Sequence, residues 1–308
     1  MLLDPKAQAI LDAAKNSGKA PVYTLPIEEA RKIMYNNFVN PNRVLEEIDS
    51  IEDSSIPCIW GDMPIRIYRP NKKENNECFL FFHGGGFSIN CIETHEAICR
   101  KLAKETNRTV ISVEYRLAPE HKYPAGVEDA ISAAQWVYDN AKLLNINRDK
   151  IAIGGDSGGA HYAIVTCLYF KNRNGIKLEK QILVYPPTDY FLPGTPSLRE
   201  NDQYSVVNRD FTIWAWMNLI DSTTNLNDQY LCPLRAKDCS GLPPALVITA
   251  EGDPLRDEGE LYAKKMEKDG TKVKLSRYKG MMHGFFMQLQ VFQQANDAVK
   301  EIAEFLAE

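Results

Sequence analysis

Three observations predict an α/β protein with a mostly parallel central sheet. From residue 57 onward, short apolar runs rich in β-branched and aromatic residues alternate with longer runs that have helical apolar spacing. The short runs are apolar at most positions, which is typical of strands buried on both faces of a parallel sheet. The length of 308 residues suits one large domain, or one domain with a smaller attachment.

The first fifty-odd residues precede this alternation and predict two amphipathic helices. Apolar residues recur at helical spacing in two sets: Ala7, Ile10, Leu11 and Ala14, and then Ile27, Ala30, Ile33 and Met34. The polar faces are not notably basic, which favours a packed or capping helical pair over an anchor on a membrane surface.

Strands and helices then follow one another along the chain. The predicted strands are 65–68, 78–82, 109–113, 151–153, 181–184, 245–249 and 273–275. The predicted helices between and after them are 93–105, 126–144, 159–172, 257–269 and 290–307. Ligands of such sheets lie at the carboxyl ends of the strands, so we expect the functional site there.

One long insertion breaks the alternation at residues 188–235, and it contains a run, 211–220, that is apolar nearly all round. Such a helix should be buried on several sides. We expect residues 1–55 and 188–235 to form a joint helical cap over the strand ends. Residues 56–187 and 236–308 are then the α/β catalytic domain.

The composition excludes several classes of function. Lys plus Arg number 36 and Asp plus Glu number 41, which gives a net charge of −5. A mildly acidic protein is not expected to bind nucleic acid or to anchor stably on an anionic membrane. The start of the chain has no signal-peptide pattern and no window resembles a membrane span, so we expect a cytoplasmic protein. Seven scattered cysteines without a CxxC pair indicate reduced thiols rather than a metal site.

A serine lies between glycines where a predicted strand meets a predicted helix. Glycine near a helix start costs about 1 kcal/mol relative to alanine, so something other than helix stability must require Gly158 and Gly159. The pattern Gly155-x-Ser157-x-Gly159 in this context predicts a nucleophile elbow. In so tight a turn the serine oxygen projects, and the residues two positions before and after it are pressed together. Ser157 is therefore the candidate nucleophile, and Gly158 lets its backbone N–H approach a substrate.

A serine nucleophile needs a histidine that takes its proton. Downstream of Ser157, and apart from His161 on the helix that follows it, the sequence contains one histidine, His283. It stands in a glycine-flanked loop just after the last predicted strand, where such a base is expected. His283 is the candidate general base.

The histidine in turn needs a carboxylate that fixes its tautomer. Asp253 follows the predicted strand 245–249 in a turn and precedes His283, which fits the chain order serine, acid, histidine of α/β-hydrolases. Three other carboxylates remain open as alternatives: Glu251, Asp257 and Asp189.

Acyl transfer also needs backbone N–H groups that converge on the developing oxyanion. The segment 83–87, His-Gly-Gly-Gly-Phe, follows a predicted strand and supplies a loop without side chains. We expect Gly84, Gly85 and Gly158, with Gly86 as a further possibility, to form the oxyanion hole. A phosphate-binding loop is disfavoured, since no GKS/T or GxGxxG element follows. His83 is expected to pin the loop by hydrogen bonding. The remaining histidines, His95, His121 and His161, are expected to be structural or surface residues.

Five motifs together resemble the hormone-sensitive-lipase-like, or bacterial type IV, branch of the α/β-hydrolases. They are HGGGF at 83–87, YRLAPE at 115–120, GDSGG at 155–159, DPLRDEG at 253–259 and HGF at 283–285, in the family's order and spacing. The resemblance covers about residues 56–307, and the cap only in general layout. Two positions depart mildly from the family: Gly158, where alanine is common, and Glu114, where aspartate is frequent.

The resemblance implies an α/β-hydrolase fold and a carboxylesterase acting on short acyl esters. It implies Ser157 as nucleophile, Asp253 as acid and His283 as base, with oxyanion donors from glycines 84–86 and from Gly158. It also implies a helical cap and no cofactor. The expected partner is a small-molecule ester substrate, and the chain could form a homodimer.

Two other functions remain open from the sequence. The same triad serves amides and peptides, so the chain could be an amidase or peptidase. Some members of this fold bind small molecules without turnover, but the hormone receptors among them have lost the histidine that stands here at His283.

Overall fold

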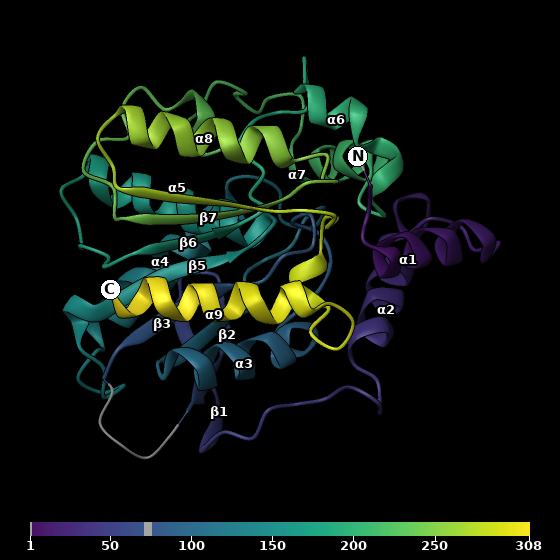
Figure 1. Cartoon of the computed structure of the whole chain (residues 1–308). Coiled ribbons are helices and arrows are strands. Elements are labelled where there is room, and N and C mark those ends of the chain that lie inside the picture. The colour runs from purple at the N-terminus through teal and green to yellow at the C-terminus, as the bar shows by residue number, and fades with distance from the viewer. Residues whose placement is uncertain (1, 71–75) are drawn as a thin grey trace.

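A central sheet organises the chain, and the computed structural model describes residues 2–70 and 76–308 of it. Within these residues the sheet has eight strands in the order β1-β2-β4-β3-β5-β6-β7-β8 (Figure 1). The strands β3 to β8 pair in parallel, whereas β1 with β2 and β2 with β4 are antiparallel. The strands are β1 (Ser50–Cys58), β2 (Gly61–Arg69), β3 (Cys78–Phe82), β4 (Thr109–Val113), β5 (Ile151–Asp156), β6 (Gln181–Val184), β7 (Ala245–Ala250) and β8 (Val273–Tyr278). The predicted mostly parallel α/β fold is confirmed.

Helices cover both faces of the sheet. Those described are α1 (Pro5–Asn16), α2 (Ile27–Phe38), α3 (Glu96–Thr106), α4 (Ala125–Asp139), α5 (Gly158–Asn172), α6 (Pro196–Glu200), α7 (Arg209–Leu219), α8 (Arg256–Lys268) and α9 (Gln293–Ala307). Helices α4, α5 and α8 share one hydrophobic cluster with the sheet, and α1, α3 and α9 share another on the opposite face. No helix among the described residues is long and apolar enough to cross a bilayer.

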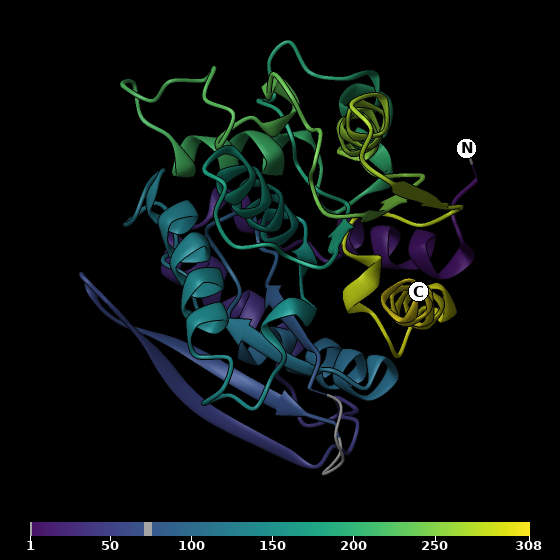
Figure 2. The ribbon, with the colours of Figure 1, turned by 90° about the vertical axis from the view of Figure 1, so that its left-hand side faces the viewer.

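The central strands follow from their composition. Every residue of β3, β4, β5, β6 and β7 is buried, which requires apolar side chains on both faces. Each predicted strand coincides with an observed one. The edge strand β1 was not predicted, because its sequence SIEDSSIPC is mostly polar and exposed and lacks an apolar run. Figure 2 shows it as part of the long β1–β2 hairpin that extends from the edge of the sheet at lower left.

One predicted helix is shorter in the structure. The apolar pattern predicted a helix over 126–144, but α4 ends at Asp139, where the N–H of Asn140 closes the last turn on the carbonyl of Trp136. Leu144 and Ile146 remain buried in the turn that follows. The periodicity therefore identified buried residues correctly, but the chain reaches the core there without helical backbone.

The helices predicted to form a cap come from two distant segments of the chain. In Figure 1, α1, α2, α6 and α7 all lie at the right-hand end of the molecule. Ala30 of α2 packs in one hydrophobic cluster with Phe211 and Ala215 of α7 and with Ile89. Residues 50–55, which the prediction assigned to the cap, belong to β1 instead. Helix α7 also has a solvent face, since Met217 is 57% exposed, and is not buried all round.

Arg31 joins helix α2 to the loops that follow β3 and β4. Its Nε donates to the carbonyl of Ser88 at 2.9 Å, and its Nη2 donates to the carbonyl of Ala118 at 3.0 Å. The same guanidinium makes two hydrogen bonds to the Glu120 carboxylate, at 2.8 and 2.7 Å. The ion pair is partly exposed and contributes little by itself, but the two carbonyl contacts fix α2 over the loop that follows β3.

Candidate active site

Ser157 stands in a strained turn between β5 and α5. The strand ends at Asp156, the helix begins at Gly158, and Ser157 between them has φ 51° and ψ −123°. A positive φ is rare for a residue with a side chain and is stored where surrounding structure enforces it. A Cβ atom at Gly155 or Gly159 would lie far inside van der Waals contact with the carbonyl oxygen of Phe82. These two glycines are therefore required by crowding, as the sequence predicts.

Ser157, His283 and Asp253 form a chain of two hydrogen bonds. The distance from His283 Nε2 to Ser157 Oγ is 2.9 Å, and the distance from His283 Nδ1 to Asp253 Oδ2 is 2.7 Å. All three side chains are buried. Since a carboxylate only accepts, Nδ1–H donates to Asp253 and Nε2 is left to accept the serine proton. The structure thus brings the predicted triad together from the ends of three segments, and its catalytic role stays a prediction.

The three alternative acids have other partners. Glu251 accepts the N–H of Gly280 at 2.8 Å. The Asp257 carboxylate accepts the N–H of Ser197 at 2.8 Å. Asp189 pairs with Arg235 at 2.7 Å. Among the described residues, Asp253 is the one carboxylate that is hydrogen-bonded to His283.

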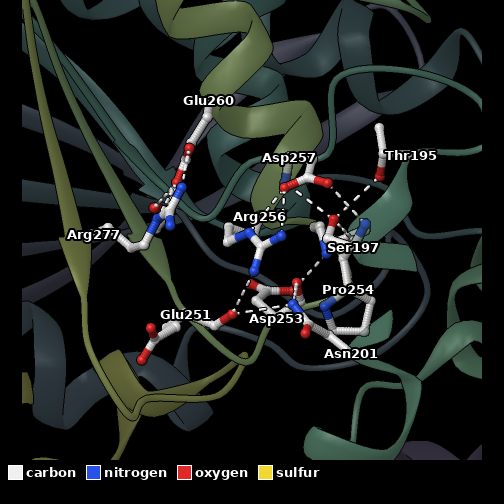
Figure 3. Close-up of polar contacts among 12 residues, drawn as sticks. Thr195, Ser197, Asn201, Glu251, Asp253, Pro254, Arg256, Asp257, Glu260 and Arg277 are labelled. Atoms are coloured by element: carbon white, nitrogen blue, oxygen red, sulfur yellow. Dashed lines mark hydrogen bonds and ion pairs between the residues drawn. The ribbon is translucent and has the colours of Figure 1, made fainter. Parts of the chain in front are cut away.

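The inserted segment supports the loop that carries Asp253 (Figure 3). Asn201 Nδ2 donates to the carbonyls of both Glu251 and Asp253, each at 3.0 Å. Ser197 Oγ donates to the carbonyl of Pro254 at 2.7 Å. The N–H of Leu255 occupies Asp253 Oδ1 at 2.7 Å, so that Oδ2 is the oxygen that faces His283. Contacts from Asn201, Ser197 and Leu255 therefore fix the position of the Asp253 loop and carboxylate.

In the glycine loop after β3, one of the predicted oxyanion donors, Gly84, is already hydrogen-bonded. The N–H of Gly84 donates to Asp156 Oδ1 at 2.8 Å and lies 3.3 Å from His95 Nε2. That single proton is engaged in the interior, so the prediction of Gly84 as an oxyanion donor is wrong. None of the described residues accepts a hydrogen bond from the amides of Gly85, Gly86 or Gly158. These three amides carry the candidate role instead.

Two histidines near the serine keep structural positions. His83 Nδ1 lies 2.9 Å from the carbonyl of Gly84, and burial lowers the pKa of this histidine to about 3. The ring nitrogen therefore donates as a neutral imidazole and pins the loop, as expected from the sequence. His161 Nδ1 lies 3.1 Å from the carbonyl of Pro187, and burial lowers the pKa of His161 to about 4.

Tyr185 is a site neighbour that the sequence did not reveal. It follows β6 with φ 39°, and its ring lies 4.4 Å from the His283 ring, centroid to centroid. Its hydroxyl donates to Asp156 Oδ2 at 3.3 Å. The only available signal was its place directly after a strand that neighbours the serine strand.

The part of the chain that the structure describes contains no candidate metal site. No group of three or more His, Cys, Asp or Glu side chains there could hold an ion. The seven cysteines are free thiols, and five of them are buried.

Comparisons with known proteins show which family the chain resembles. The model of a family described as having the alpha/beta hydrolase fold matches residues 79–287. The arylesterase of Saccharolobus solfataricus is 35% identical over 92% of this chain and 92% of its own. Carboxylesterase NlhH of Mycobacterium tuberculosis is 39% identical over 73% of this chain and 71% of its own. Carboxylic ester hydrolase LipN of the same organism is 37% identical over 79% of this chain, and the match spans 65% of LipN.

Solved structures show the same likeness over nearly the whole chain. A hyperthermophilic esterase of the archaeon Pyrobaculum calidifontis superposes with a TM-score of 0.93 at 36% identity, covering 99% of this chain and 98% of its own. The ester-hydrolase EH1AB1 from the metagenome of Lake Arreo superposes with a TM-score of 0.94 at 34% identity, with the same coverage. The chain therefore belongs to the α/β-hydrolase family, in its hormone-sensitive-lipase-like branch of carboxylic ester hydrolases.

Proposed function

We propose that the protein is a serine carboxylesterase that hydrolyses short-chain acyl esters through an acyl-enzyme, with Ser157, His283 and Asp253 as its triad. The observation that carries this proposal is the pair of hydrogen bonds, 2.9 and 2.7 Å long, that joins the three side chains beside a strained serine. The ester hydrolases among the relatives support the reaction class.

Acylation comes first. Ser157 Oγ attacks the ester carbonyl carbon while its proton passes to His283 Nε2. The carbonyl oxygen becomes an oxyanion, which the amides of Gly85, Gly86 and Gly158 stabilise by hydrogen bonds. When the tetrahedral intermediate collapses, the bond to the alcohol oxygen breaks and the His283 proton passes to that oxygen. The alcohol leaves and the acyl group remains on Ser157.

Deacylation repeats the sequence with water. His283 takes a proton from a water molecule whose oxygen attacks the acyl carbon, and the same amides receive the second oxyanion. Collapse breaks the bond to Ser157 Oγ, which recovers the proton from His283. The products are one carboxylic acid and one alcohol, and Asp253 orients the imidazole throughout.

The cap supports a preference for short acyl groups. A Cβ atom at Gly86 would lie 3.0 Å from the Phe211 ring and 3.1 Å from Ala215, so α7 sits directly on the glycine loop. Trp216 of the same helix is buried, and its ring packs edge-on against Phe87. Bulky groups this close to the candidate oxyanion donors leave limited depth for an acyl chain.

A series of p-nitrophenyl esters from acetate to palmitate tests the proposal, with wild type and Ser157→Ala assayed side by side. We expect kcat/KM to be highest for the short esters and to fall with chain length. Ser157→Ala should lose at least roughly 10³-fold in kcat, since the nucleophile is removed. Retention of more than a few per cent of the wild-type rate in Ser157→Ala would refute the serine, and a maximum at palmitate would refute the chain-length preference.

A further inference from the structure

The carboxylate of Asp156 touches the glycine loop directly. Asp156 precedes Ser157 at the end of β5 and is buried, with 4% of its surface exposed. Its Oδ1 accepts the N–H of Gly84 at 2.8 Å and lies 3.1 Å from His95 Nε2. Its Oδ2 accepts the hydroxyl of Tyr185 at 3.3 Å. One side chain therefore links the candidate nucleophile to the loop that holds the candidate oxyanion donors.

The contact is too close for any other residue at position 84. A Cβ atom on Gly84 would lie 2.5 Å from Asp156 Oδ2 and 2.8 Å from the Asp156 carbonyl oxygen. Real Cβ atoms do not approach oxygen so closely, so either the loop or β5 would have to shift. Gly84, whose N–H is not free to bind the oxyanion, is thus needed for close packing of the glycine loop against β5.

His95 is the ring partner of the Asp156 carboxylate, with Nε2 lying 3.1 Å from Oδ1. A buried carboxylate beside the place where an oxyanion forms would raise the energy of that state unless a partner compensates it. His95 is fully buried, its Nε2 faces Asp156, and its Nδ1 lies 2.9 Å from Thr94 Oγ1. Burial opposes ionisation of Asp156, but His95 and the Gly84 N–H outweigh it and hold the pKa of the carboxyl below its usual range.

We propose that Asp156 and His95 are positioning residues, a buried pair that holds the glycine loop in register with Ser157 so that the amides of Gly85 and Gly86 meet the oxyanion. The inference rests on the proposed function. Because Asp156 is joined to Ser157 by one peptide bond and to Gly84 by one hydrogen bond, the pair fixes the distance between nucleophile and donors. Neither residue touches the substrate.

The effect of losing the pair should fall on the transition state. Misplacing donors by a fraction of an ångström weakens oxyanion stabilisation but leaves ground-state binding of the ester nearly unchanged. We expect Asp156→Asn to lower kcat for p-nitrophenyl acetate about 10- to 100-fold, with KM within about threefold of wild type. His95→Ala should lose a similar factor, and His95→Gln, whose amide can still donate to Asp156, should retain more activity than His95→Ala.

A trifluoromethyl ketone supplies the second readout, because its adduct with a serine carries an oxyanion. We expect the inhibition constant of phenyl trifluoromethyl ketone to weaken in Asp156→Asn by the same factor as kcat/KM. Glu114→Gln is the matched control. Glu114 is a half-buried carboxyl that accepts the N–H of Ile92, in the same loop, without a described contact to Gly84. It should keep kcat within about twofold of wild type.

The outcomes separate this inference from the proposed function. If Ser157→Ala is inactive while Asp156→Asn keeps the wild-type kcat and inhibition constant, the positioning role is wrong and the triad stands. A change confined to KM, or an equal loss of kcat in Glu114→Gln, also overturns it. If Ser157→Ala keeps the wild-type rate, the proposed function itself fails. Should Asp156→Asn not fold, the two His95 variants decide, and equal activity of both with wild type contradicts the proposal.

Discussion

Two buried carboxyls in adjoining regions of the molecule have opposite surroundings. Asp253, in the loop after β7, faces the imidazole of His283 at 2.7 Å. The Glu258 carboxyl, in the first turn of α8, accepts two backbone groups, the N–H of Thr188 at 2.6 Å and that of Asp189 at 3.0 Å. Those two residues begin the inserted segment 188–235, which is predicted to form part of the cap.

The partner of each carboxyl determines what it can do. Burial raises the pKa of Glu258 to about 8, against the opposing effect of the two N–H groups, so this group is largely protonated at neutral pH. A neutral carboxyl suits a permanent contact between α8 and the start of the inserted segment. Asp253 instead faces a histidine that becomes an imidazolium in the proposed mechanism, and the carboxylate stabilises that positive charge. Similar burial thus accompanies a structural contact in one region and the candidate catalytic acid in the other.

The largest expected effect is the loss of kcat when Asp253, the carboxyl that faces His283, is replaced with Asn. The amide can present the wrong tautomer of His283 to Ser157 while preserving the shape of the site, so kcat should fall roughly 10²- to 10⁴-fold. Steady-state kinetics on p-nitrophenyl acetate measures this, with Asp257→Asn as a matched change in the same region. A loss of less than tenfold in Asp253→Asn, or an equal loss in Asp257→Asn, would remove Asp253 from the role of acid.

Replacing Glu258 with Gln is expected to change the pH dependence of the unfolding free energy rather than the activity. The folded pKa of about 8 lies above the ordinary value of 4.5, so the folded state binds more protons than the unfolded state between these pH values. Wild-type stability should therefore include a contribution that is present below about pH 4.5 and is lost as pH rises through 8. Glutamine cannot ionise, so the difference in unfolding free energy between variant and wild type should move in the variant's favour across this range.

Urea unfolding at several pH values measures that difference. Each unit of pKa difference corresponds to about 1.4 kcal/mol, so we expect a change of a few kcal/mol between pH 5 and pH 9. Glu267→Gln, on an exposed position of the same helix, is the control and should show no such trend. Parallel curves for wild type and Glu258→Gln would mean that Glu258 is ionised in the folded protein.

The sequence predicted the sheet interior well because burial on both faces leaves a strong signal. The bounds of β3, β4 and β6 match the prediction residue for residue. Strand β1 was not predicted because it is a polar edge strand, which is stabilised by pairing with β2 rather than by its own side chains. The end of α4 was placed too late because buried residues continue beyond the helix into a turn.

The site was predictable to the extent that it follows from local chain order. Ser157 stands where strand meets helix, and His283 and Asp253 follow strands, so their places could be read from neighbouring residues. Gly84 was assigned wrongly because the direction of an N–H depends on what lies across the interior, here Asp156. His95 and Tyr185 could not be found for the same reason, since only the folded backbone brings them to that carboxylate.

Labelling with a fluorophosphonate, followed by mass mapping of the modified peptide, tests the central claim most directly. The reagent phosphonylates a serine only when a base takes its proton. We expect a single adduct on Ser157, formed at a rate that His283→Ala lowers roughly 10²-fold or more, with hydrolysis lost in step with labelling. An adduct on another residue that abolishes hydrolysis, or equal labelling of Ser157 in wild type and His283→Ala, would contradict the account.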